Sequence, residues 1–294
     1  MHRYWLADVF TDRPFSGNPL AVFPEGAAVD PAQMQTIAGE LNLSETVFVL
    51  PPDNPAHAAR VRIFTPASEL PFAGHPTIGT ALLLARFAPQ ALADGEHLLV
   101  LEEGVGPVPV RVTMQGGQAL RAEFAAAQAP SFAPAPPHIA TMLGLGEDDI
   151  LPRCSVASCG VPFLCVPLRN RAALSRIMPN NAAMQRGLAG LAHGIYAYTE
   201  DLDRPTLLHA RMFATGLGIV EDPATGSAAA ALGGLLGTYD SRSDADLSWE
   251  ISQGEDLGRP SRIVVTTEIR QARVAAVRVG GQAVFMGEGQ LFAR

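Results

Sequence analysis

Two stretches of the sequence, half a chain length apart, repeat one pattern and limit the fold more than any other feature. Arg62-Ile63-Phe64 and Arg211-Met212-Phe213 share an Arg, an apolar residue and a Phe. Each is followed by Pro-x-x-Gly-(Ser/Thr)-Ala, at 76–81 and at 223–228. Pro76 and Pro223 are 147 positions apart (223 − 76), half of the 294 residues. Such self-similarity indicates a duplicated architecture, so we predict two similar lobes.

Each repeat has the pattern of a sheet wrapped around one central helix. A weaker match, between residues 17–20 and 160–163, falls in the same order as the first two. Residues 78–85 and 228–236 are apolar on every side of a helix, and such a helix must be enclosed. Strands are predicted at 4–10, 18–23, 46–50, 61–64, 98–101, 108–113, 262–267, 273–279 and 283–286.

One outer helix is predicted to begin at Asp30-Pro31. Asp is a favoured N-cap residue, and Pro suits the first helical position. The residues that follow at i, i+3, i+4 and i+7 are apolar and define one buried face: Met34, Ile37, Ala38 and Leu41.

A Pro-rich stretch at 130–137 separates the repeats. Four of its eight residues are Pro, which suits an extended linker better than a helix interior or a central strand. We therefore predict an N-terminal lobe at 1–129 and a C-terminal lobe at 138–294. The sequence leaves open whether the last strand, around Gln282–Phe292, returns to the first lobe.

The composition excludes several chemistries. All 21 basic residues are Arg, so the chain has no Lys for a Schiff base or for a phosphate-binding P-loop. The net charge of −8, without a basic cluster, argues against nucleic-acid or anionic-membrane partners. No apolar run is long enough to cross a bilayer, and no signal peptide is evident. We interpret Cys154, Cys159 and Cys165 as reduced, buried thiols of a cytoplasmic protein.

The matching loops before the two central helices are the candidate ligand site. The first backbone N–H groups of a helix have no intrahelical partner and attract anions. Small residues, Gly74 in one loop and Gly226 and Ser227 in the other, allow a ligand to approach that backbone. A duplicated pair of such loops is predicted to grip a carboxylate across a cleft between the lobes.

Three ionisable residues are candidates for the chemistry. His75 lies in the first loop, Asp222 lies in the second, and Glu45 stands between the outer helix and a strand. Burial would raise the pKa of the Glu45 carboxyl group, as a general base near neutral pH requires. The alternatives are that Asp222 only caps its helix and that His75 only starts one. His193 and His209 have no partner at a zinc-ligand spacing, so no metal site is expected.

Four runs of residues form specific motifs in order along the chain. They are Phe15-Ser16-Gly17-Asn18-Pro19-Leu20-Ala21-Val22, Leu43-Ser44-Glu45-Thr46, Glu69-Leu70-Pro71-Phe72-Ala73-Gly74-His75-Pro76-Thr77 and Glu221-Asp222-Pro223-Ala224-Thr225-Gly226-Ser227-Ala228. Gln253-Gly254 and Gly258-Arg259-Pro260-Ser261 add a later motif. Over nearly its whole length, the chain resembles the phenazine-biosynthesis PhzF-like family.

The resemblance implies an α+β, diaminopimelate epimerase-like fold and an isomerase that needs no cofactor. Its phenazine-pathway member acts on trans-2,3-dihydro-3-hydroxyanthranilate, a small carboxylate. The resemblance implies that Glu45 moves a proton and that His75 and Asp222 orient the substrate. Gly74, Gly226 and Ser227 would then supply polar contacts, including contacts to the carboxylate. It also implies a homodimer.

Two other functions remain open at this stage. One is an epimerase or lyase reaction on a related carboxylic acid, and the other is a non-catalytic protein that binds small anions. Related racemases and epimerases use two opposed Cys, but Ala73 and Ala224 stand in the matching loops here. A two-thiol mechanism is therefore disfavoured. The sequence does not identify the physiological substrate.

Overall fold

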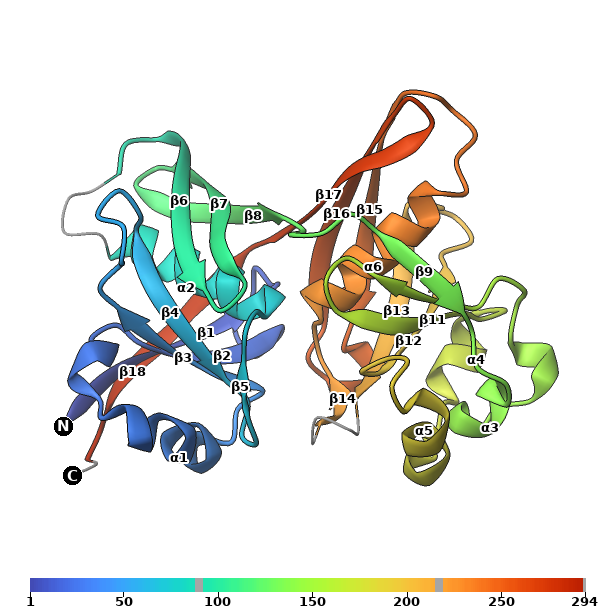
Figure 1. Ribbon diagram of the computed structural model, residues 1–294, viewed down its shortest axis with the longest axis horizontal. Helices are drawn as coiled ribbons and strands as arrows, with labels where there is room; N and C mark the ends of the chain where they lie inside the picture. Colours follow the sequence, from blue (N-terminus) through green and yellow to red (C-terminus); the bar gives the residue numbers. More distant parts are fainter. Residues whose placement is uncertain (88–91, 215–218, 293–294) are drawn as a thin grey trace. The chain divides into compact units, whose positions relative to one another are not determined.

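The computed structural model describes residues 1–87, 92–214 and 219–292 (Figure 1). The chain divides into two compact units. Unit 1 comprises Met1–Ala125 and Gly280–Arg294, and unit 2 comprises Ala126–Val279. Strands dominate both units and helices are few, so the predicted α+β class is confirmed.

In its described residues, unit 1 is a mixed sheet with the α-helices α1 and α2. Its elements are β1 (His2–Val9), β2 (Asn18–Phe23), the 3₁₀ turn η1 (Gly26–Ala28), α1 (Pro31–Leu41), β3 (Glu45–Leu50), β4 (Ala59–Phe64), β5 (Glu69–Leu70), α2 (Gly74–Arg86), β6 (Gly95–Glu103), β7 (Gly106–Gln115), β8 (Gln118–Ala125) and β18 (Ala283–Leu291). The pairs β18–β1, β1–β2, β3–β4, β4–β5, β6–β7 and β7–β8 are antiparallel. The pairs β2–β3 and β4–β6 are parallel.

Unit 2 repeats this arrangement. Its elements are β9 (Ser131–Pro134), α3 (Ile139–Leu143), η2 (Glu147–Asp149), β10 (Ser155–Ser158), β11 (Pro162–Pro167), α4 (Arg171–Ser175), α5 (Asn181–Leu188), β12 (Ile195–Glu200), β13 (Leu207–Ala214), β14 (Ile219–Asp222), α6 (Gly226–Gly237), β15 (Ala245–Gln253), η4 (Glu255–Leu257), β16 (Ser261–Arg270) and β17 (Arg273–Gly281). The pairs β9–β10, β10–β11, β12–β13, β13–β14 and β15–β16 are antiparallel, and β11–β12 and β13–β15 are parallel.

The two units therefore share one order of parallel and antiparallel pairs. In unit 2, β9 holds the place that β18 holds in unit 1, beside the first strand of the sheet. Part of the stretch predicted as a linker, Ser131–Pro134, is thus a strand rather than a free connection. All four of its residues are exposed, which is where a sheet tolerates Pro. The C-terminal strand β18 pairs with β1 of unit 1.

The register of the repeat differs from the predicted one. Gly74 begins α2 and Gly226 begins α6, and each follows a Pro by three residues. The matching motif is therefore Glu-x-Pro-x-x-Gly, at 69–74 and at 221–226, and not the alignment of Pro76 with Pro223. The same register matches two bidentate ion pairs. Arg62 binds Glu69 through Nε and Nη2 at 2.7 Å each, and Arg211 binds Glu221 at 2.8 and 2.7 Å.

The predicted central helices are enclosed. Nearly every side chain of α2 and α6 is buried, and strands surround each helix within its own unit (Figure 1). Gly79 of α2 shows how close this packing is, because an added Cβ would lie 2.6 Å from Leu20 Cδ2. The two predicted helices that are apolar on every side thus form the cores of their units.

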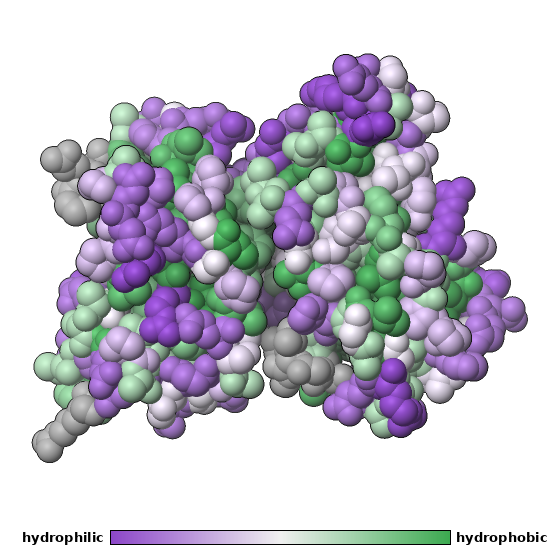
Figure 2. Space-filling view, viewed as in Figure 1, coloured by the Kyte–Doolittle hydropathy of each residue, from purple (hydrophilic) through white to green (hydrophobic). Residues whose placement is uncertain are grey.

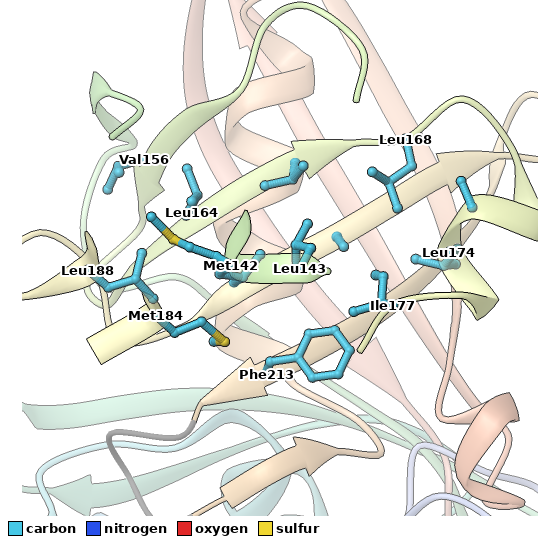
Figure 3. Packing of buried hydrophobic residues seen from close by; sticks show 14 residues of the cluster. Met142, Leu143, Val156, Leu164, Leu168, Leu174, Ile177, Met184, Leu188 and Phe213 are labelled. Atoms are coloured by element: carbon cyan, nitrogen blue, oxygen red, sulfur yellow. The ribbon is translucent and has the colours of Figure 1, made fainter. Parts of the chain in front are cut away.

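Outer helices cover a second core in each unit. Helix α1 begins as predicted, with Asp30 accepting a hydrogen bond from Ala32 N–H and Pro31 in the first turn. Its buried residues pack on a set of Phe side chains: Phe23, Phe48 and Phe64. In unit 2, α3, α4 and α5 supply Met142, Leu174, Met184 and Leu188 to a cluster that includes Leu164 and Phe213 (Figure 3).

Hydrophilic and apolar residues alternate over the face drawn in Figure 2. None of the helices in the described part of the chain is long and apolar enough to span a membrane. The three Cys are free thiols, as predicted. Cys159 and Cys165 are buried, whereas Cys154 is half-buried and so departs from the prediction.

Candidate active site

The side chain of Glu45, an ionisable carboxyl group, is buried inside unit 1. Glu45 is the first residue of β3 and pairs with Leu20 in the parallel pair β2–β3. Its side chain is only 11 % exposed. Glu45 Oε2 lies 3.3 Å from Nε2 of His75, which belongs to the first turn of α2. The fold thus joins two candidate residues that are thirty positions apart in the sequence.

The His75 ring is neutral at physiological pH. Burial lowers the pKa of the His75 imidazole to about 3, against the opposing effect of a hydrogen bond with the backbone of Pro19. Asn18 Nδ2 lies 3.3 Å from His75 Nδ1, so β2 also holds the ring. Because the ring is neutral, the 3.3 Å contact with Glu45 is a close approach of two polar atoms and not a salt bridge. A neutral imidazole donates a hydrogen bond from one ring nitrogen and accepts one at the other, without placing a full charge beside the carboxyl group.

The start of α2 offers backbone donors next to this pair. Ala73 is the N-cap residue in extended conformation, and its side chain provides no cap. The first helical hydrogen bond runs from Thr77 N–H to the Ala73 carbonyl oxygen. The N–H groups of Gly74 and His75 precede this bond, so the helix leaves them for a ligand or solvent, with the positive end of its dipole.

Asp222 occupies the corresponding loop of unit 2 but does not cap the helix itself. The N-cap residue of α6 is Thr225, and Asp222 is the last residue of β14. The Thr225 hydroxyl donates a 2.6 Å hydrogen bond to Asp222 Oδ2. The alternative in which Asp222 serves only as a helix cap is therefore wrong. Asp222 is buried, at 5 % exposure, and held by its own loop.

Gln253, at the end of β15, fixes the loop before α6. Gln253 Oε1 accepts hydrogen bonds from Tyr196 OH at 3.0 Å and from Thr225 N–H at 3.2 Å. Gln253 Nε2 donates to the Asp222 carbonyl oxygen at 2.8 Å and to Thr225 Oγ1 at 3.0 Å. Both ends of a fully buried amide are thus satisfied. Gly226 and Ser227 follow as the first two residues of α6, with helix-start N–H groups like those of α2.

The predicted site residues therefore form two sets. Glu45, His75 and Gly74 belong to unit 1, and Asp222, Gly226 and Ser227 belong to unit 2. The predicted site residues did not include three residues that hold these sets: Asn18, Thr225 and Gln253. Each of the three lies in a motif quoted above, but the motifs do not indicate what these side chains contact. Among the described residues, no group of three His, Cys, Asp or Glu side chains is placed to hold a metal ion.

The sheet wrapped around a central helix in each unit is the diaminopimelate epimerase-like fold. The sequence pattern of phenazine biosynthesis-like proteins matches residues 7–289. The chain belongs to this family, the PhzC–PhzF family.

Relatives and a solved structure agree with that assignment. The chain is 42 % identical over 300 residues to an uncharacterized isomerase of Mesorhizobium japonicum, covering 98 % of both chains. It is 36 % identical over 296 residues to the trans-2,3-dihydro-3-hydroxyanthranilate isomerase of Pseudomonas aeruginosa, covering 99 % of this chain and 100 % of that protein. A predicted epimerase from Pseudomonas aeruginosa has the same fold, with a TM-score of 0.82, 34 % identity and complete coverage of both chains. The protein is a PhzF-like isomerase.

Proposed function

We propose that Glu45 is the general acid/base of this isomerase and that its substrate is a small cyclic or unsaturated amino or hydroxy carboxylic acid. The supporting observation is the buried Glu45 carboxyl group, 3.3 Å from the neutral His75 ring. A general base must lie within contact distance of the proton that it takes, and exclusion of water strengthens the electrostatic interactions of the site. The isomerase from Pseudomonas aeruginosa suggests trans-2,3-dihydro-3-hydroxyanthranilate as the first substrate to test.

In the proposed reaction, Glu45 removes a proton from one ring carbon and returns it to another, so that a double bond moves. Negative charge develops on the substrate in the transition state, and groups already in place must stabilise it. His75 supplies a hydrogen bond without competing as a charged acid. Gly74, Gly226 and Ser227 are proposed as substrate-binding residues, because the N–H groups at the start of a helix attract a carboxylate.

Asp222 is proposed to bind the amino group of the substrate. It is the acidic member of the unit 2 set, and the Thr225 hydroxyl holds one of its oxygens. A carboxylate fixed in this way fits an ammonium group, because its orientation is set before the ligand binds. We further propose that the protein acts in the cytoplasm as a homodimer, which light scattering on the purified protein would test.

The experiment compares wild type, Glu45→Gln and Glu40→Gln with trans-2,3-dihydro-3-hydroxyanthranilate. Glu40 is an exposed residue of α1 and provides a matched loss of charge in the same unit. We expect Glu45→Gln to lower kcat by at least about 100-fold, as loss of a general base does, and to keep ligand-induced thermal stabilisation. Glu40→Gln should match wild type. Full turnover by Glu45→Gln would overturn the proposal.

A further inference from the structure

The duplication places Glu103 of unit 1 where unit 2 has Gln253. In the parallel pair β4–β6, Arg60 lies opposite Glu102, and in β13–β15, His209 lies opposite Ser252. Both β6 and β15 end one residue later, at Glu103 and Gln253.

The Gly that follows each of these residues packs on the Pro of the loop before the central helix. A Cβ on Gly104 would lie 2.7 Å from Pro71 Cα, and one on Gly254 would lie 2.7 Å from the Pro223 carbonyl oxygen. Val105 N–H also donates to the Pro71 carbonyl oxygen at 3.1 Å. The two strand ends are therefore equivalent, and each supports the loop that carries candidate site residues.

Glu103 contacts the His75-bearing turn through Thr77. Thr77 Oγ1 lies 2.7 Å from Glu103 Oε1 and 2.8 Å from the Ala73 carbonyl oxygen. Ala73 is the N-cap residue of α2, and Thr77 lies two positions after His75. Through one hydroxyl, Glu103 thus joins the end of β6 to the first turn of α2, as Gln253 joins the end of β15 to Thr225.

The contacts of Glu103 suit a protonated acid better than a carboxylate. A hydroxyl has a single proton to donate, and a carbonyl oxygen can only accept. If Thr77 donates to Ala73, the contact with Glu103 requires a proton on the carboxyl group. Glu103 Oε2 is buried, and no donor of the described residues reaches it. A buried carboxylate oxygen without a donor is costly, whereas the uncharged amide of Gln253 fills the equivalent position without that cost.

The charged groups around Glu103 are engaged elsewhere. Glu102 accepts hydrogen bonds from Asp53 and Asn54 N–H and contacts His57, while Arg62 on β4 holds Glu69 on β5. Arg60 on β4 lies 3.5 Å from Asp53. On α2, His75 is neutral, and Arg86 lies in its last turn. Arg111 on β7 faces Glu96 and Glu123.

Burial therefore decides the ionisation of Glu103. It raises the pKa of Glu103 to about 8, and only a hydrogen bond donated by Thr77 to the ionised carboxylate opposes the rise. We propose that Glu103 is a positioning residue that holds the His75-bearing turn as a neutral acid, and that loss of its proton loosens this turn and lowers activity at alkaline pH. The part that concerns activity rests on the proposed function of Glu45 and His75.

The test follows backbone hydrogen exchange and turnover between pH 6.5 and 9.5. It compares wild type, Glu103→Gln, Glu103→Ala and the control Glu123→Gln, which removes an Arg121-paired carboxylate from the same unit. Exchange times are scaled to the intrinsic rate at each pH. In wild type and the control, we expect protection of residues 72–80 to fall above pH 8. In Glu103→Gln, protection should stay constant, and in Glu103→Ala it should be low at every pH.

Turnover of trans-2,3-dihydro-3-hydroxyanthranilate is expected to depend on pH in the same way as the protection of residues 72–80. Wild-type kcat/KM should fall about tenfold per pH unit above pH 8, and Glu103→Gln should lose that fall. Equal exchange in wild type and Glu103→Gln at every pH would overturn the inference. An alkaline fall that persists unchanged in Glu103→Gln would overturn it as well. The exchange measurement needs no substrate, so absence of turnover in wild type with the expected exchange response counts against the proposed function alone.

Discussion

Replacing Glu103 by Gln removes one titrating proton from the folding equilibrium of unit 1. Burial raises the pKa of Glu103 to about 8 in the folded chain, from the ordinary value of 4.5 that it regains on unfolding. Between these values the folded chain keeps a proton that the unfolded chain has lost. Titration of Glu103 therefore leaves the free energy of unfolding at its full value below pH 4.5. That free energy declines as the pH rises, until Glu103 ionises in the folded state near pH 8.

The size of the decline follows from the single proton. The free energy of unfolding falls by about 1.4 kcal/mol for each pH unit inside this window. From pH 5.5 to 7.5, wild type should lose about 2.7 kcal/mol relative to Glu103→Gln, because Gln does not titrate. The slope depends on the number of protons and not on the absolute cost of burying the acid. It therefore applies even if the substitution itself shifts stability by a constant amount.

Urea unfolding at 25 °C, followed by the fluorescence of Trp5, provides the assay. Trp5 is buried in β1 of unit 1, and Trp249→Phe removes the Trp of unit 2 from the signal. The free energies of unfolding of the chains with and without Glu103→Gln, both in the Trp249→Phe background, are compared at pH 5.5, 6.5 and 7.5. Parallel pH profiles would refute the account, because they would mean that Glu103 is already ionised in the folded protein.

Two further substitutions test the packing around the site. Arg211→Met should destabilise unit 2 by about 3–5 kcal/mol, because it leaves Glu221, whose side chain is only 10 % exposed, without its ion partner. Arg242→Met removes an exposed Arg from its ion pair and should cost less than about 1 kcal/mol. Equal costs in urea unfolding would contradict this. Gly17→Ala should cost more than about 2 kcal/mol, since Gly17 has φ +66° and a Cβ would lie 2.3 Å from the Val9 carbonyl oxygen. Gly116→Ala has a similar φ but open space around it, so it should cost only about 1 kcal/mol in thermal unfolding, and a cost equal to that of Gly17→Ala would refute the packing argument.

Local sequence signals predicted the elements that depend on local rules. The start of α1 follows from Asp30-Pro31, because capping and the fixed φ of Pro act within one turn. The enclosure of α2 and α6 follows from their apolar composition. The strand at Ser131–Pro134 was missed because its pairing with β10 arises from tertiary structure and its Pro content argues against a strand.

Motifs predicted the candidate site residues, but they did not predict the contacts of these residues. Glu45 reaches His75 only because β3 pairs in parallel with β2, and a sequence does not reveal that pairing. The repeat was aligned on Pro76 and Pro223 because these positions resemble each other locally. The Arg62–Glu69 and Arg211–Glu221 pairs show the true register, since ion pairs across neighbouring strands depend on the fold. For the same reason, the equivalence of Glu103 and Gln253 emerged only from the strand registers.

Glu45 is proposed to carry the proton that the isomerase moves. The most direct test is a single turnover of trans-2,3-dihydro-3-hydroxyanthranilate in D₂O, with the product analysed by mass spectrometry and NMR. We predict that wild type forms product and that Glu45→Gln forms none above the rate without enzyme, while still binding the substrate. Product formed by Glu45→Gln at the wild-type rate, with the same deuterium content at the same carbon, would contradict the claim.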